Sequence, residues 1–89
     1  MKAVINVVSK DMVGIIYNVS KILYENKANI LDLSQTVMQD IFTMVMLVDL
    51  DKADCTFSEL SDKLDGLGKE LALKISISNE EIFNAMHRI

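Results

Sequence analysis

The sequence predicts an α+β fold: a ferredoxin-like βαββαβ two-layer sandwich with a short extra C-terminal helix. Segments rich in β-branched residues alternate with segments whose apolar residues recur at helical spacing. The order divides into two halves, each made of a strand, a helix and a return strand. Right-handed crossovers then place both helices on one face of a four-stranded antiparallel sheet. The 89 residues are sufficient for one core, so residues 1–89 are expected to form a single domain.

The first half begins with a strand expected at Lys2–Ser9, where β-branched residues predominate. A helix is predicted from Met12 to the neighbourhood of Asn26-Lys27, because the apolar residues change to helical spacing. Asp11 is placed to cap this helix by accepting hydrogen bonds from the amides of its first turn. A second strand is predicted at Ile30–Met38. The apolar stripe of the helix comprises Met12, Ile15, Ile16, Val19, Ile22 and Leu23.

The second half follows a break of hairpin size at Gln39-Asp40, after which a third strand is predicted at Ile41–Leu50. Thr56 and Glu59 match a capping box, in which each side chain satisfies an amide of the other residue at the start of a helix. The apolar stripe of this second helix comprises Phe57, Leu60, Leu64 and Leu67.

The end of the second helix is expected at Gly66 and Gly68, because a left-handed glycine often closes the last turn. Leu71–Ser78 alternates apolar and polar residues, which predicts a fourth strand with one buried face. A second capping box runs from Ser78 to Glu81 and opens the terminal helix. The apolar side of that helix comprises Ile82, Phe83, Met86 and Ile89.

The third strand is apolar on both faces, with Ile41, Val45 and Leu47 on one side and Phe42, Met44, Met46, Val48 and Leu50 on the other. Two helices on one face leave the other apolar set without cover. Because open antiparallel sheets usually keep one face wet, this excess favours a lid. We expect the terminal helix and a second copy of the chain to provide it.

Composition excludes several function classes. The net charge of −4 and the pI of about 4.7 disfavour binding to nucleic acid. The apolar stretches are too short to cross a membrane, and Asn6 interrupts the first one too early for a signal peptide, so a cytoplasmic location is expected. Cys55 is the one cysteine and His87 the one histidine, which leaves no disulfide, no zinc-type ligand set and no implied cofactor.

The loop after the first strand reads Lys10-Asp11-Met12-Val13-Gly14-Ile15-Ile16. It resembles the signature of ACT domains, in which Asp or Asn stands three residues before a glycine and aliphatic residues open the helix. The resemblance continues through Asn18–Leu23 and the passage Lys27–Asp32, and it covers essentially the whole chain. The sequence also resembles small stand-alone bacterial ACT proteins of an uncharacterised family, and half of the glycine-cleavage-system transcriptional repressor.

The resemblance implies a regulatory module that binds an effector, often an amino acid, where the first loop meets the second strand of a neighbouring copy. The implied ligand-binding residues are Asp11, Met12, Val13, Gly14 and Ile15 from the loop and Asn29, Ile30, Leu31 and Asp32 from the strand. Glycine allows close approach of backbone to a ligand, and amides at a helix N-terminus suit a carboxylate. Serine-sensing ACT domains commonly have Asn where this chain has Asp11, whose carboxylate favours an ammonium group.

Simpler roles stand beside these. Asp11 could cap the helix without binding a ligand, and Gly14 could allow the helix to pack closely on a strand. Asn29 could be the residue that ends the helix. Cys55 beside a helix start is expected to be an ordinary small apolar residue rather than a thiol of lowered pKa, and His87 to complement a helix dipole.

The function predicted from the sequence is a homodimeric regulatory module that binds a small molecule of the amino-acid class. The alternative is a constitutive protein–protein interaction module without a small ligand. A further protein partner is compatible with both. An enzyme is not expected, because no nucleophile and base can be paired from one Cys and one His that lie outside the candidate pocket.

Overall fold

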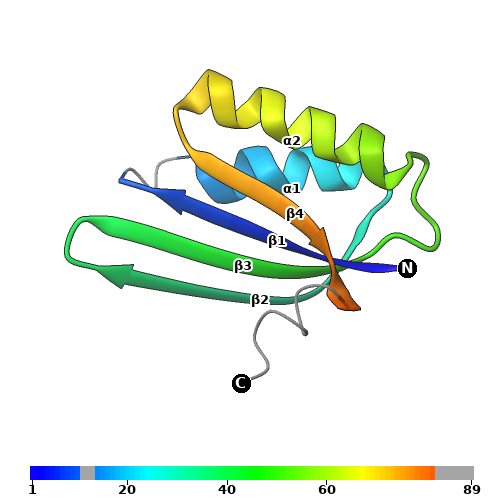
Figure 1. Cartoon of the computed structure of the whole chain (residues 1–89), viewed down its shortest axis with the longest axis horizontal. Helices are drawn as coiled ribbons and strands as arrows, with labels where there is room; N and C mark the ends of the chain where they lie inside the picture. Colours follow the sequence, from blue (N-terminus) through cyan, green and yellow to red (C-terminus); the bar gives the residue numbers. More distant parts are fainter. Residues whose placement is uncertain (11–13, 82–89) are drawn as a thin grey trace.

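The computed structural model describes residues 1–10 and 14–81. The elements are β1 (Lys2–Ser9), α1 (Ile15–Glu25), β2 (Asn29–Met38), β3 (Ile41–Asp49), α2 (Phe57–Leu71) and β4 (Lys74–Asn79). The four strands form one antiparallel sheet in the order β2-β3-β1-β4. Both helices lie on the same side of this sheet (Figure 1). The predicted βαββαβ order and the ferredoxin-like sandwich are confirmed.

The core lies between the helices and one face of the sheet. Register places Ile5 opposite Met46 on one side and Ile77 on the other, so the three strands present side chains to the same layer. The fully or nearly fully buried residues on this face of the sheet are Ala3, Ile5, Val7, Phe42, Met44, Met46 and Val48. Those of the helices are Ile15, Val19, Leu23, Leu60, Leu64 and Leu67. Met44 and Met46 therefore fill the core, whereas Met38 at the end of β2 is exposed.

The start of α1 differs from the prediction. The helix begins at Ile15, and Gly14 occupies the N-cap position with a left-handed φ of 75°. A left-handed residue cannot continue a right-handed helix, so a helix running from Met12 through Gly14 is wrong, and so is Asp11 as its N-cap. Asp11, Met12 and Val13 themselves lie outside the described residues.

The end of α1 at Glu25 confirms the predicted boundary, and Asn26 holds it in place. The Asn26 side chain is buried; its Nδ2 donates to the Ile22 carbonyl at 2.7 Å, and its Oδ1 accepts from Lys63 Nζ at 2.5 Å. Its carbonyl accepts from the Asp54 amide at 2.8 Å. Because Asn26 ends the helix and Asn29 is already the first residue of β2, the alternative of Asn29 as helix terminator is wrong.

The start of α2 confirms the predicted capping box. The Thr56 hydroxyl accepts from the Glu59 amide at 3.1 Å, and the Glu59 carboxylate accepts from the Thr56 amide at 2.9 Å. Phe57, which follows Thr56, packs partly buried against the core.

The end of α2 is not at its glycines. The helix continues through Gly66 and Gly68 to Leu71, and Ala72 closes it in the left-handed conformation. Gly68 instead permits close packing on β4, because a Cβ there would lie 2.8 Å from Ile75 Cγ2. Leu71 therefore belongs to the helix, and β4 begins later than the predicted strand, at Lys74.

The chain turns out of the sheet after β4 and enters a helical turn at Glu80 and Glu81. Asn79 Oδ1 accepts from the Glu81 amide at 2.8 Å, whereas Ser78 pairs with Val4 in the sheet. The predicted cap at Ser78 is therefore displaced to Asn79. The apolar residues of the predicted terminal helix (Ile82, Phe83, Met86, Ile89) and His87 lie outside the described residues. No helix within 1–10 and 14–81 is long and apolar enough to cross a membrane.

The helix-free face of the sheet carries the second apolar set expected from the sequence. Val8 and Ile41 are 40% and 44% exposed, and Val45 and Leu47 are half-buried. Val4 on the same face is buried. The surplus of apolar side chains on this face is thus confirmed, and its cover by a second copy stays a prediction.

Candidate functional site

The loop half of the candidate site lies where β1 leads into α1. The left-handed φ of Gly14 would strain any side chain, and a Cβ there would lie 3.2 Å from Asn18 Nδ2. The Gly14 carbonyl accepts from both the Asn18 amide, at 2.9 Å, and Asn18 Nδ2, at 2.7 Å. These bonds fix the first turn of α1. Glycine brings no side chain to cap its amides, and no acidic residue stands in that turn, so the helix start favours an anionic group.

The strand half of the candidate site lies at the start of β2. Asn29 pairs with Asp49, and a β-bulge between Ile30 and Asp32 leaves Leu31 out of the regular register. Bulges re-aim side chains locally and are frequent at sites of recognition. Asn29, Ile30, Leu31 and Asp32 are all exposed. One carboxylate oxygen of Asp32 accepts from the Leu33 amide at 2.8 Å. Its other oxygen takes no part in that bond.

The two halves are not brought together within one chain. Lys2, the first residue of β1, and Asn29, the first residue of β2, both lie opposite Asp49 of β3. The strands β1 and β2 are therefore parallel, and they start at the same edge of the molecule (Figure 1). Gly14 follows the far end of β1. At 3.3 Å per residue, the length of β1 separates the two halves by roughly 25 Å.

The only cysteine lies just before α2, and burial raises the pKa of the Cys55 thiol. Nearby Lys63 acts in the opposite direction, and the carboxylates of Glu59 and Asp54 add to the increase. The structure thus disagrees with a thiolate stabilised by the helix start and agrees with an ordinary, partly buried side chain. Glu59 behaves differently: its hydrogen bonds with the Thr56 amide and hydroxyl lower the pKa of its carboxyl group.

In the part of the chain that the structure describes, no group of three or more His, Cys, Asp or Glu side chains lies close enough together to hold a metal ion. The candidate site therefore consists of backbone amides, an asparagine, a carboxylate and apolar side chains. Such groups bind and orient a small molecule through hydrogen bonds and ion pairs.

Comparison with known proteins identifies the family of the chain. A family model described as an ACT domain matches residues 2–78. The chain belongs to the ACT domain family. It is 53% identical over 89 residues to a UPF0237 protein of Clostridium acetobutylicum, covering 100% of both chains. UPF0237 is a family of small uncharacterised proteins.

Two solved structures show the same ACT fold. An ACT domain protein from Streptococcus pneumoniae superimposes with a TM-score of 0.81 at 41% identity, and 93% of each chain is covered. A putative glycine cleavage system transcriptional repressor superimposes with a TM-score of 0.77 at 19% identity, covering 86% of this chain and 45% of that one. The resemblance to half of such a repressor is thereby confirmed at the level of fold. ACT domains are commonly regulatory modules that bind small ligands, rather than catalysts.

Sequence reasoning missed one exposed surface of the ACT domain. Tyr17 and Tyr24 are 68% and 84% exposed on α1, with Ile16 beside them. Together with Ser20 and Lys21 they line a shallow hollow of about 510 Å³. Two tyrosines seven positions apart share one helix face, and this face does not coincide with the buried stripe. The seven-residue spacing of Tyr17 and Tyr24 in the sequence could have predicted this shared face.

Proposed function

We propose that this ACT domain is a cytoplasmic, non-catalytic regulatory module, one domain per chain, that binds an amino acid between two copies of the chain. The separation of Gly14 from Asn29 by the length of the sheet carries this proposal. Both positions belong to the effector-binding region that the ACT resemblance implies, yet one chain holds them at opposite edges. A site that uses both therefore requires a neighbour.

An antiparallel pairing of β2 with β2 of a second copy supplies that neighbour. β2 is an outer strand of the sheet, so its far edge is available for pairing. Two-fold antiparallel pairing sets the start of one β2 beside the end of the other, near Met38. Met38 pairs with Ile41 at the edge of the molecule where β1 also ends and the Gly14 loop begins. The dimer would then carry two equivalent sites, each built from both copies.

The exposed flank of α1 supports the same geometry. α1 and α2 lie side by side on the sheet, and the buried stripe of α1 faces the strands. Ile16, Tyr17 and Tyr24 are directed away from the core. Tyrosine is enriched among the residues that dominate binding energy at protein interfaces. Pairing through β2 would bring the two α1 flanks toward each other and cover these side chains.

The groups at this joint site match the two charges of an amino acid. The amides at the start of α1, where the N-cap residue Gly14 has no side chain to bond them, suit the α-carboxylate. The carboxylate of Asp32, from the second copy, suits the α-ammonium group, and Asp11 carries the same charge in the loop. Asn29 both donates and accepts hydrogen bonds and would orient the ligand. Binding would stabilise the paired arrangement and so bias the attachment of a downstream partner.

The test is thermal unfolding of the protein with each of the twenty standard amino acids at millimolar concentration. We expect one or a few of them to raise the melting temperature, because a ligand that binds only the folded dimer stabilises it by mass action. Asp32→Ala and Asp11→Ala should abolish that increase. Asp62→Ala, at an exposed position of α2, is the matched control and should retain it.

Sedimentation at several protein concentrations checks the dimer itself. Absence of any increase in melting temperature across the panel would refute the amino-acid ligand. If the protein were nevertheless a dimer, that result would favour the alternative of a constitutive interaction module. The exposed apolar flank of α1 is the observation that supports this alternative.

A further inference from the structure

The sheet has a second outer strand, β4, on the side opposite β2. β4 pairs with β1 along one edge only, and its ladder with β1 runs from Lys74 to Asn79 without a register shift. Every second residue of such a strand directs its amide and carbonyl away from the sheet. By contrast, the ladder of β2 is interrupted by the bulge between Ile30 and Asp32. β4 thus presents a regular, undistorted edge to a further strand.

A hollow of about 520 Å³ runs along this edge. One wall is the flank of α2, at Asp65, Gly68 and Lys69, and the other includes Asn6 and Val8 of β1, on the helix-free face. The floor is Leu73 together with the start of β4, at Lys74, Ile75 and Ser76. The lining therefore includes residues from both sides of the sheet around β4, the outer strand beside which a fifth strand would add.

The close packing of α2 on β4 makes this wall rigid. Gly68 brings the helix so near that a Cβ would lie 2.8 Å from Ile75 Cγ2 and 3.1 Å from the Leu73 carbonyl oxygen. The Leu73 amide donates to the Gly68 carbonyl at 2.9 Å, which ties the start of β4 to the end of α2. A segment entering the hollow would therefore meet a preformed surface, and little ordering of the domain would oppose its binding.

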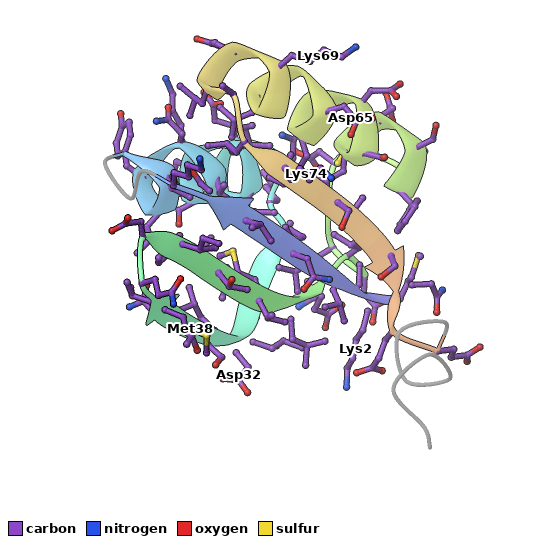
Figure 2. The ribbon with its side chains drawn as sticks, turned by 60° about the vertical axis from the view of Figure 1, so that its left-hand side comes forward. Lys2, Asp32, Met38, Asp65, Lys69 and Lys74 are labelled. Carbon is purple, nitrogen blue, oxygen red and sulfur yellow. The ribbon has the colours of Figure 1, made fainter. Side chains whose placement is uncertain are left out.

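The excess of lysine over acidic side chains in the lining of the hollow favours an acidic occupant. Lys69 stands on the α2 wall and Lys74 at the start of β4, with Asp65 as the one acidic neighbour in the lining. Figure 2 shows these three side chains on the α2 and β4 side, away from Asp32 and Met38 of β2. An adjoining hollow of about 550 Å³ shares Lys74 and adds Lys10. Within the described residues, none of these lysines forms an ion pair.

This local excess of positive charge contrasts with the net charge of −4 for the whole chain. The chain as a whole repels acidic proteins at long range, whereas this edge attracts an acidic segment at short range. We propose that the β4 edge binds an extended acidic peptide segment of a partner protein, which adds to the sheet as a fifth strand. Main-chain hydrogen bonds to β4 would supply affinity, and acidic side chains near Lys69 and Lys74 would supply specificity.

The probe for this surface is a fluorescein-labelled octapeptide of alternating glutamate and valine, with binding followed by fluorescence anisotropy. A peptide of alternating lysine and valine controls for charge. The glutamate–valine peptide with N-methyl groups on alternate residues controls for main-chain pairing, because it keeps every charge and loses the amide donors of one edge. We expect binding of the unmodified acidic peptide alone, weakened by added salt.

The variant Lys69→Glu/Lys74→Glu should weaken binding of the acidic peptide at least tenfold. Lys2→Glu/Lys52→Glu makes the same change in net charge at exposed positions outside the hollow, and it should bind like the unaltered protein. Far-ultraviolet circular dichroism establishes that both variants are folded. Equal binding by both variants would overturn the proposal, as would undiminished binding of the N-methylated peptide.

The proposal stands apart from the amino-acid site at β2. Neither lysine variant should change the increase in melting temperature produced by an amino acid. The amino-acid proposal and the peptide proposal can therefore be refuted independently of each other. A second copy of the chain is the competing occupant of the β4 edge. Failure of the acidic peptide to bind, together with a smaller assembly for Lys69→Glu/Lys74→Glu in sedimentation, would assign the edge to that copy and refute the peptide.

Discussion

The two glycines of α2 offer a matched pair of substitutions with opposite expected effects. Replacing either glycine by alanine removes backbone freedom from the unfolded chain and favours the helix by about 0.8–1 kcal/mol. At Gly66 an added Cβ meets no atom within 4 Å, so the whole gain should appear as stability. Gly66→Ala is therefore expected to raise the free energy of unfolding by about 1 kcal/mol.

At Gly68 the added Cβ would lie 2.8 Å from Ile75 Cγ2 and 3.1 Å from the Leu73 carbonyl oxygen. The second contact is with backbone, so it cannot be relieved by a side-chain rotation alone. Overpacking of this kind costs about 1–3 kcal/mol, which equals or exceeds the helical gain. Gly68→Ala should therefore change stability by about 0 to −2 kcal/mol, and the two variants should differ by about 1–3 kcal/mol.

Urea unfolding at one protein concentration measures this difference. For a domain with an m-value of about 1 kcal/mol/M, the midpoints should be separated by about 1 M or more. Ile75→Ala removes the nearer clashing atom, so Gly68→Ala should be less damaging in that background than alone. Equal stabilisation by the two glycine substitutions, or no coupling to Ile75, would refute the close packing of α2 on β4.

Three further predictions concern the ends of the helices. Ala72→Gly should raise stability by a few tenths to about 1 kcal/mol in the same urea assay, because Ala72 is held at a φ of 55°, and unchanged or lower stability would contradict this strain. Asn26→Ala should lower stability by about 1–3 kcal/mol through loss of its two side-chain hydrogen bonds, and a double-mutant cycle with Lys63→Met should show coupling between the two residues. Because the pKa of the Glu59 carboxyl group is lowered in the folded protein, its ionised form contributes to folding stability above the ordinary pKa of 4.5. That contribution is lost as pH falls through the folded-state pKa. Unfolding measured from pH 6 downward should show a smaller loss for Glu59→Gln than for the unaltered protein, whereas parallel curves would argue against the capping box.

Most of the fold follows from patterns that the sequence states locally. The helical stripe of α2 and the Thr56–Glu59 capping box involve residues a few positions apart, and both are present as expected. The hairpin at Gln39 follows for the same reason, since it lies directly between two strands. The elements and their order were therefore predictable without knowledge of tertiary contacts.

The errors arose where a residue serves a distant partner. Gly68 resembles a helix terminator in the sequence, but it is required by Ile75, which belongs to another element. Gly14 resembles an ordinary position of the first turn, and only its left-handed φ reveals that α1 begins after it. The role of Asn26 depends on Lys63, 37 positions away, which no local pattern indicates.

The two segments of the candidate site could be predicted from the sequence, but not their positions relative to each other. The sequence indicates the loop at Gly14 and the strand start at Asn29, but the distance between them follows from the shared pairing partner Asp49. The bulge beside Leu31 also escaped prediction, because a bulge is a property of two paired strands rather than of one. Ile16, Tyr17 and Tyr24 could be recognised as an exposed surface only once the structure showed which face of α1 remains uncovered.

The hydrogen bonds of Asn26 join the two βαβ halves at the far end of α1 from Gly14. Through this one residue α1 is tied to Lys63 of α2 and to Asp54 of the loop before α2. α1 has 11 residues, so at 1.5 Å per residue it acts as a stiff rod of roughly 16 Å between the loop and this junction. We therefore expect a displacement of α1 at its Gly14 end to reach the second half of the chain through the hydrogen bonds of Asn26.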